Sequence, residues 1–394
     1  MYAASWDCVI VVLCLFLLSV VSKISTSASL PFVSRAPHRN NPSAIALSES
    51  ERSSSPLVHA RGGVARTERP ALTALAASSG LQFRFRDKLR TETQVLDGNQ
   101  LRKLALTLGR RSLYPGVEVA ARPPADGTLV PPGYHLVYFT PGDVEENLGA
   151  DGSHAMYDSL APFTRVKWTG GRMRWVDESD GGSPLRVGDE VEERTKLVKT
   201  VPQKGTNGTE RILMDVVKEF WGPKGLALVD ERTFIIRPEM TNSSPAAEKR
   251  LKDVVVRGPS TMAFVSNKGV KSAYMSCRRR WSPTGLFRFS ALTFNSHRIH
   301  YDPSWAAAME GHEGCVVHEQ LNLICMLDYW RDVCAAKKGH SIRQFSYRTS
   351  DPIYAGETYE IGTDSEKRDD QGVSWEISVR KQGKLCMIGT VLGV

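Results

Sequence analysis

The sequence predicts an α+β protein built from antiparallel sheets, and three features of the 394-residue chain lead to this expectation. Strand-like runs rich in β-branched and aromatic residues recur at strand-and-turn distances in its middle part. Near the carboxyl end, a helical segment precedes several strand-like runs of about ten residues. A hydrophobic content of 41% allows ordinary cores. This order of elements is typical of a sheet that wraps around a helix.

The first 80 residues are expected to lie outside the fold. The apolar run 8–21 has nearly the length of a signal-peptide core and is short for a membrane span. No Lys or Arg precedes it, whereas the following stretch is rich in Ser, Ala and Arg and poor in acids, as transit peptides are. The sequence therefore predicts a mitochondrial targeting leader over residues 1–80, with a membrane-anchored or secretory role for residues 8–21 as the alternative.

The net charge of +8 is concentrated near the amino end. Residues 1–90 contain 11 Lys or Arg and 5 Asp or Glu, while the remainder contains 40 and 38. Residues 91–394 are therefore nearly neutral, which argues against a nucleic-acid partner, because such a partner would require a basic face on the folded part of the chain. The basic triplet Arg278 to Arg280 is interpreted as a solvated strand end. Seven cysteines without framework spacing indicate a reducing compartment.

Residues 81–245 are expected to form a first, non-catalytic domain. Leucines at helical spacings predict a helix of about three turns, with Asp97 or Asn99 as its cap. Aromatic and β-branched residues around Gly170 and Gly171 predict two strands joined by a Gly-Gly turn within 163–176. Three more strand-like runs follow, and strands paired in sequence order make an antiparallel sheet; the runs are 189–201, 210–221 and 226–238.

Residues 265–394 are expected to form a second, catalytic domain after a linker over 246–264. The linker region is polar and rich in small residues. The second domain contains a helix-like segment from about 316 to 336, and the closing strands come after it.

The stretch "FNSHRIHYDPSW", residues 294–305, is the most informative motif, and a metal site is its first interpretation. Five residues with nitrogen or sulfur ligand atoms lie within positions 297–318, and a zinc site needs only four. They are His297, His300, His312, Cys315 and His318. Closed zinc sites usually contain short Cys-x-x-Cys or His-x-x-x-His pairs, and apart from mixed pairs none occurs here. We therefore expect no metal and no cofactor.

A helix cap is the second interpretation. Asp302 followed by Pro303 is the arrangement of a helix start, with the carboxylate accepting backbone N–H groups. A short helix would then end at Gly311. This interpretation accounts for Asp302 and leaves the histidines open.

Proton-transfer catalysis is the third interpretation. His300 lies just before one helix, and a longer helix begins near His318, so a base can face a helix amino terminus. That pairing suits removal of a proton beside a carbonyl, because an enolate-like oxygen must then be stabilised. Hydration or dehydration of an acyl thioester makes this demand.

Segments 287–306, "FRFSALTFNSHRIHYDPSWA", and 310–321, "EGHEGCVVHEQL", resemble the MaoC-like hydratase/dehydratase family. Within it, the similarity is to the hydroxyacyl-thioester dehydratase type 2 and mesaconyl-CoA hydratase branch, and it covers roughly residues 81–394. The resemblance implies a double hot-dog fold, two antiparallel sheets each wrapped around a helix. It also implies a hydro-lyase that interconverts 3-hydroxyacyl and trans-2-enoyl thioesters of CoA or acyl carrier protein, with a homodimer left open.

The resemblance implies specific site residues. The family's Asp, Asn and His positions fall on Asn295, His297 and His300, so only the histidine is kept. His300 is then the general acid/base, Asn295 orients water or the substrate hydroxyl because an amide cannot act as a base, and His297 assists. Arg298, or Arg278 to Arg280, would meet carrier phosphates.

The start of the longer helix would bind the thioester carbonyl through His318 and Glu319. The family commonly has Gly where this chain has Glu319, and the added bulk and charge predict weakened or altered catalysis as one outcome. Two other classes stay open: a hot-dog acyl thioesterase and a catalytically weak acyl-thioester-binding protein.

Overall fold

The computed structural model describes residues 73–154, 161–177, 179, 181–205, 208–239, 256–266, 274–336 and 339–394. Most of the expected leader, including the apolar run 8–21, lies outside this part of the chain. Within it, no helix combines the length and apolar character needed to cross a membrane. Helix α2 (Ala74–Phe85) begins inside the range assigned to the leader, so regular structure starts before residue 81.

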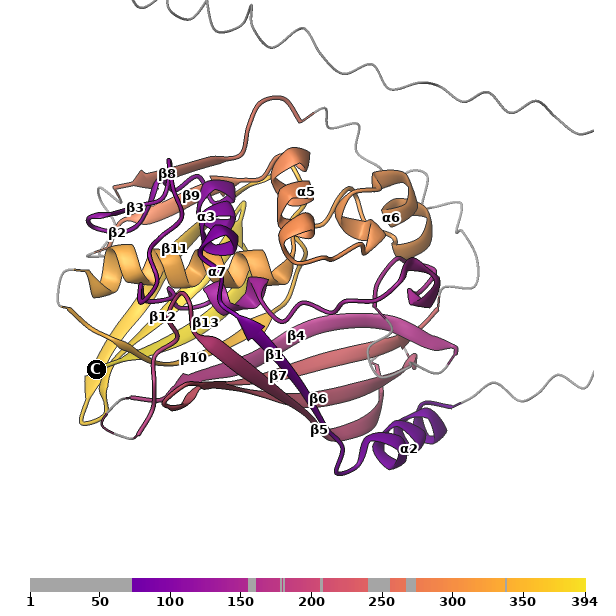
Figure 1. Cartoon of the computed structure of the whole chain (residues 1–394). Helices are drawn as coiled ribbons and strands as arrows, with labels where there is room; N and C mark the ends of the chain where they lie inside the picture. Colours follow the sequence, from indigo (N-terminus) through magenta and orange to yellow (C-terminus); the bar gives the residue numbers. More distant parts are fainter. Residues whose placement is uncertain are drawn as a thin grey trace, which may run out of the picture. The chain divides into compact units, whose positions relative to one another are not determined.

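The described strands form one antiparallel sheet of eleven strands, ordered β1-β5-β6-β7-β4-β10-β13-β12-β11-β9-β8 (Figure 1). A small second sheet pairs β2 with β3. The strand bounds are β1 (Leu89–Val95), β2 (Ser112–Tyr114), β3 (Val117–Glu118), β4 (Phe163–Trp175), β5 (Glu190–Lys204), β6 (Glu210–Gly222), β7 (Gly225–Pro238), β8 (Thr261–Val265), β9 (Ser276–Arg280), β10 (Ile342–Thr349), β11 (Thr358–Asp369), β12 (Gly372–Lys381) and β13 (Lys384–Gly393).

The large sheet consists of two halves that meet where β4 pairs with β10. The amino-terminal half contains β1 and β4 to β7, and the carboxyl-terminal half contains β8 to β13. Helix α7 (Glu319–Tyr329) lies along the carboxyl-terminal half (Figure 1). Helix α3 (Gly98–Thr107) contacts the carboxyl-terminal part of the chain through Gln100, whose side-chain nitrogen donates to the carbonyl of Leu292 at 2.7 Å. The expected α+β, double hot-dog fold is confirmed, and the two half-sheets are continuous.

The helix caps follow local sequence rules. Asp97 accepts a hydrogen bond from the backbone N–H of Asn99 at the start of α3, as predicted. Asp302 caps α6 (Pro303–Glu310) by accepting from the N–H of Trp305, and Gly311 ends that helix with a φ of 69°. The expected cap at Asp302 is therefore confirmed. The remaining helical elements are α5 (Pro283–Leu292), η1 (Tyr134–Val137), η2 (Glu145–Asn147) and η4 (Arg298–His300).

The prediction of a Gly-Gly turn within residues 163–176 is wrong, because β4 continues through this region as one strand. Its glycines serve close packing between β7 and β10. A Cβ atom on Gly171 would lie 2.2 Å from the carbonyl oxygen of Glu231 and 2.6 Å from the hydroxyl of Tyr347. A register shift between Trp168 and Gly170 accompanies this crowding.

The predicted helix over residues 316–336 begins later than expected. Val317 donates its backbone N–H to Ile353 and Ala355 donates to Cys315, each at 2.8 Å, so the segment before α7 is extended. After Tyr329 the helix continues in π-helical form over Trp330–Ala335. The extended segment matters because it holds the candidate catalytic loop.

A buried polar cluster connects the amino-terminal half to α7. Asp328 accepts from the Arg110 Nε at 2.7 Å and from the Tyr134 hydroxyl at 3.1 Å. Its second oxygen lies 2.9 Å from Arg331. Because the Asp328 side chain is almost completely buried, its charge depends on these two arginines for compensation.

The expected domain boundaries stay a prediction. Residues 240–255, which include the start of the proposed linker, lie outside the described residues. Strand β8 begins at Thr261, inside the linker range, and pairs with β9.

Candidate active site

Most of the stretch 294–305 forms the loop between α5 and α6. Phe294 has a φ of 48°, an uncommon backbone conformation for a bulky residue. The backbone N–H of Val316 donates to the carbonyl of Ile299 at 2.8 Å. This hydrogen bond holds the loop 294–300 against the extended segment that precedes α7.

His300 is oriented by a hydrogen bond to the backbone. Its Nδ1 lies 2.8 Å from the carbonyl oxygen of Val316, and only the imidazole can donate in this pair. The neutral ring therefore carries its proton on Nδ1 and leaves Nε2 as a base. His300 is 4% exposed. Burial, reinforced by the charge of a protonated His297, lowers the pKa of His300 to about 3.

The ring of His318 packs against the ring of His300. The two rings are stacked, with centroids 3.6 Å apart and planes at 14°. His318 is fully buried, and its Nε2 lies 2.9 Å from the Ser290 hydroxyl of α5. Burial first, and then the neighbouring His300, lowers the pKa of His318 well below its ordinary value. A neutral ring in this position packs without charge repulsion.

Asn295 and His297 complete the loop. The Asn295 side-chain oxygen accepts the backbone N–H of His297 at 3.0 Å, and its amide nitrogen forms no hydrogen bond to another described residue. His297 Nε2 lies 3.5 Å from the carboxylate of Asp151. Burial lowers the pKa of His297, and Asp151 opposes that shift. Asp151 also accepts the N–H of Arg298 through its backbone carbonyl, at 2.8 Å.

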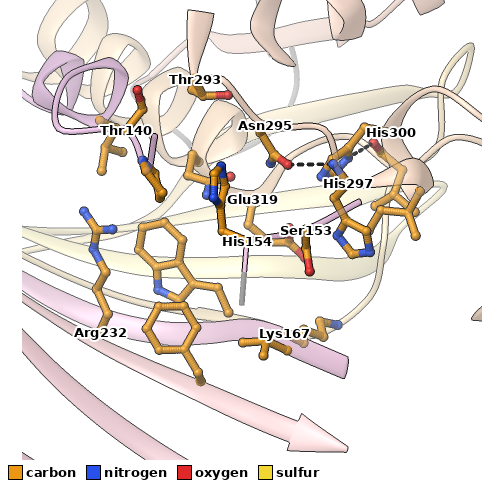
Figure 2. Close-up of a pocket in the computed structure, with 18 of the residues that line it drawn as sticks. Thr140, Ser153, His154, Lys167, Arg232, Thr293, Asn295, His297, His300 and Glu319 are labelled. Atoms are coloured by element: carbon orange, nitrogen blue, oxygen red, sulfur yellow. Dashed lines mark hydrogen bonds between the residues drawn. The ribbon is translucent and has the colours of Figure 1, made fainter. Parts of the chain in front are cut away.

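A cavity of about 310 Å³ lies in front of this loop, and both halves of the molecule line it. Figure 2 shows Asn295, His297, His300 and Glu319 among its lining residues, with Lys167 and Arg232 also labelled. The amino-terminal half contributes an apolar wall, which suits an acyl chain; it includes Leu136, Phe139, Val166, Trp168 and Phe234.

Helix α7 directs its amino terminus at the cavity. Glu319 and Gln320, its first two residues, both line the cavity, and first-turn N–H groups have no intrahelical acceptor. Burial raises the pKa of the Glu319 carboxyl, although the nearby charge of Lys167 opposes the rise. This end of α7 therefore combines backbone donors with a carboxyl group that resists ionisation.

Cations gather where the cavity adjoins the outer face of β4, β6 and β7. Lys167 and Arg237 line both the cavity and an outer hollow that also contains Arg211. Burial lowers the pKa of Arg237, and the charges of Arg165 and Arg211 lower it further. Among the described residues, Lys167, Arg211 and Arg237 have no acidic side chain within ion-pairing distance. The three form a cationic cluster without direct ion pairs, although Glu319 lies near Lys167 and Glu310 lies near Arg237.

Several predicted arginines lie outside the cavity lining. Arg298 pairs with Asp302 at 2.7 Å and covers the ring of Trp305. Arg278 lies 3.6 Å from Glu360. The solvated interpretation of the basic triplet is wrong for Arg279, which is 2% exposed because it points into the core and covers Trp281.

Sequence reasoning missed Asp151 and Lys167. Asp151 follows a Pro- and Gly-rich passage more than 140 residues before His297, and no local period connects the two. Lys167 belongs to a recognised strand, but its contact with the cavity depends on how the halves are joined. Of the five candidate metal ligands, the rings of His297, His300 and His318 lie close together, but within the described residues no group of three or more His, Cys, Asp or Glu is arranged to hold a metal ion.

Comparison with known proteins gives consistent relatives. The chain is 28% identical over 234 residues to mesaconyl-C(4)-CoA hydratase of Chloroflexus aurantiacus, covering 59% of this chain and 73% of that protein. It is 23% identical over 248 residues to the mitochondrial hydroxyacyl-thioester dehydratase type 2 of Schizosaccharomyces pombe, covering 59% and 77%.

Solved structures share the fold. A MaoC-like dehydratase superimposes with a TM-score of 0.54 at 14% identity, covering 80% of this chain and 99% of that one. The MaoC-like dehydratase of Phytophthora capsici gives 0.53 at 14% identity, with 80% and 98% covered. The family model for hydroxyacyl-thioester dehydratase type 2 matches residues 133–355. This match covers more than half of the chain, includes strands of both half-sheets and the loop of His300, and the chain therefore belongs to the hydroxyacyl-thioester dehydratase type 2 family.

Proposed function

We propose that the protein is a hydro-lyase that interconverts 3-hydroxyacyl and trans-2-enoyl thioesters. The observation that carries this proposal is His300, whose Nδ1 donates to the Val316 carbonyl and whose ring lines the cavity. The Nε2 atom is consequently an unprotonated base at the edge of an apolar cavity. In hydration, it accepts a proton as water adds to C3 of the acyl chain.

Two further groups would assist this step. The Asn295 amide nitrogen would hold the water or the hydroxyl group, since the amide oxygen is already bonded to the N–H of His297. The N–H groups at the start of α7 would bind the thioester oxygen as it gains enolate character. His297 would position the loop through Asp151, and His318 would support the ring of His300 from outside the cavity lining.

The test is hydration of a panel of short, medium and branched trans-2-enoyl-CoA thioesters, followed as loss of the enoyl absorbance. The His300→Gln variant should lose about 10² to 10⁴-fold in kcat, the contribution expected of a general base. His340→Ala is the control, because His340 packs against Trp375 and does not line the cavity. If the wild-type protein hydrates none of the substrates, the proposal fails. Release of free thiol instead would identify a thioesterase.

We also propose that the cationic cluster of Lys167, Arg211 and Arg237 binds the phosphate groups of the thioester carrier. It lies beside the cavity, and the carboxylates of the same hollow, Asp215 and Glu231, form ion pairs with Lys199, Arg172 and Arg174 instead. The double variant Arg211→Ala/Arg237→Ala should raise the KM for an enoyl-CoA about tenfold or more, because charge-assisted contacts to phosphate are lost. The KM for the matching N-acetylcysteamine thioester, which has no phosphate, should not change. An equal effect on both substrates would contradict this assignment.

We infer a mitochondrial location from the acid-poor amino-terminal segment and from the mitochondrial relative in Schizosaccharomyces pombe. A fluorescent protein fused to the carboxyl end of the full chain should enter mitochondria. A fusion that starts at residue 73 should not. Delivery of the full-length fusion to the endoplasmic reticulum would favour the signal-peptide alternative for residues 8–21.

A further inference from the structure

We propose that the Glu319 carboxyl is the second proton-transfer group of this site, exchanging a proton with C2 of the acyl chain while His300 exchanges one with the oxygen at C3. This assignment rests on the proposed hydro-lyase function. Hydration of a double bond delivers a hydroxyl group to C3 and a proton to C2, so two proton transfers must be accounted for. Asn295 cannot supply either of them, because an amide neither gains nor loses a proton near neutral pH.

Among the described residues that line the cavity, three have carboxyl groups, and two of these are held by other partners. Glu193 accepts from Lys218 at 2.6 Å and from the Thr195 hydroxyl at 2.8 Å. Glu310 forms an ion pair with Arg165, whose Nε lies 2.7 Å from the carboxylate. The Glu319 carboxyl accepts a hydrogen bond from its own backbone N–H, but it forms no hydrogen bond or ion pair with another described side chain. It therefore faces the cavity without a side-chain partner that a substrate would have to displace.

The position of Glu319 places this carboxyl on the same cavity as the proposed base. It is the first residue of α7 and directly follows His318, whose ring stacks on His300 at 3.6 Å. Asn295, His300 and Glu319 therefore converge on one cavity from two segments (Figure 2). A thioester oxygen bound at the start of α7 would bring the adjacent C2 atom to the same helix end.

The surroundings give the two groups complementary resting states. Burial lowers the pKa of His300 to about 3, which leaves the imidazole neutral. Burial raises the pKa of Glu319, which favours the protonated acid. Other titratable groups that line the cavity are Arg165 and Lys167 from β4, Glu193 from β5, Arg232 and Arg237 from β7, Glu310 at the end of α6, and Tyr138, His154, His297 and His312 from loops. A neutral base beside a neutral acid is the pair that hydration requires.

In the hydration step, an O–H bond of water breaks as its oxygen bonds to C3, and the proton passes to Nε2 of His300. The π electrons move through the enolate form to C2, which takes the proton from Glu319. The site is left with an imidazolium and a carboxylate, and a proton returned from His300 to Glu319 through water restores both. Dehydration is the same sequence reversed.

An ordinary structural role makes different predictions. A carboxylate in the first turn of a helix is stabilised by the helix dipole and would stay ionised. In that case Glu319→Gln would change stability slightly and leave the dependence of kcat on pH unaltered. If Glu319 is the acid, the hydration rate must fall as pH rises through its pKa.

The experiment measures kcat and KM for enoyl-CoA hydration against pH in the wild type, Glu319→Gln, Glu319→Asp and the control Glu376→Gln, a β12 carboxyl outside the cavity lining. We expect Glu319→Gln to lower kcat by about 100-fold or more, with KM changed less than about threefold. Its alkaline fall in kcat should vanish. Glu319→Asp should retain that fall at lower activity, and Glu376→Gln should match the wild type.

Two results would overturn the assignment, and they are distinguishable from failure of the proposed function. One is a Glu319→Gln variant with a wild-type kcat and the same alkaline fall. The other is a more active Glu319→Gln, which would mean that the carboxyl only obstructs the carbonyl. A wild-type protein inactive on every enoyl thioester would instead overturn the hydro-lyase proposal and this assignment together.

Discussion

At the scale of single residues, burial makes His300 a different base from the free imidazole that the sequence suggests. An unperturbed histidine titrates near pH 6.5, and loss of the base form would then reduce activity below that pH. The pKa of His300 is lowered to about 3 by burial, so the base form persists through the mildly acidic range. The lowered pKa also makes protonation costly, and a nearby carboxylate would offset this cost during turnover.

The first prediction concerns the acidic side of the pH profile. Between pH 7 and pH 5, kcat/KM for enoyl-thioester hydration should stay nearly constant, because His300 stays unprotonated. A base with a pKa of 6.5 would instead be protonated over this range, and kcat/KM would fall. Steady-state rates in buffers of constant ionic strength measure this profile. A fall centred near pH 6.5 that persists in the His297→Gln variant would show that His300 titrates normally.

Ser290 carries the second prediction at this scale. Its hydroxyl lies 2.9 Å from Nε2 of the fully buried His318, whose Nδ1 has no hydrogen-bond partner in the described part of the chain. Ser290→Ala should lower the free energy of unfolding by about 1–3 kcal/mol, the cost of leaving a buried polar atom unpaired. Urea unfolding measures this loss. Ser374→Ala, at a more exposed site on β12, should have almost no effect.

At the scale of elements, β4 is the strand on which the cavity depends. It pairs with β7 on one side and β10 on the other, and it carries Lys167 and Trp168 into the cavity lining. Gly171 permits both pairings, since a Cβ there would overlap Glu231 and Tyr347. The junction of the two half-sheets therefore constrains both the fold and the shape of the cavity.

A third prediction tests this junction. Gly171→Ala should destabilise the protein by about 1–3 kcal/mol through overpacking, and it should also raise the KM of enoyl thioesters as β4 moves. Gly142→Ala is the matched control, because no heavy atom lies within 4 Å of the added Cβ and its φ is not positive. Equal stability of the two variants in urea would contradict the close packing of β4.

At the scale of the whole molecule, buried histidines couple stability to pH. Burial lowers the folded-state pKa of five histidines below the unfolded value: His135, His297, His300, His312 and His318. The unfolded chain then binds more protons than the folded one as pH falls below about 6.5. Each group lowers the free energy of unfolding by up to about 1.4 kcal/mol per pH unit below that value. The raised pKa of Glu319 acts in the opposite sense, but it is one group against five.

The fourth prediction follows from this coupling. The free energy of unfolding, measured with urea, should decrease steadily from pH 7 to pH 5. In His318→Phe, which removes one of the five groups, the slope against pH should be smaller. A stability that is unchanged between pH 7 and pH 5 would contradict neutral, buried histidines.

Predictability from sequence varied with the range of the interactions. The caps at Asp97 and Asp302 were predicted correctly because a cap joins a side chain to an N–H group only two or three residues away. The turn at Gly170 and Gly171 was predicted wrongly because the same dipeptide suits a tight turn and a crowded strand. Only the neighbours β7 and β10 distinguish the two, and they are far away in the chain.

The sequence by itself determined the α+β class, most of the strands and the caps, because these depend on local periodicity and on residue chemistry, and its family resemblance singled out His300 as the candidate base. The tertiary structure alone decided which groups share a cavity and how they ionise. It brought Asp151 to His297 and Lys167 to the start of α7, and it buried His300 and Glu319 so that their pKa values move apart. Desolvation and convergence depend on contacts between distant segments, which no local pattern specifies.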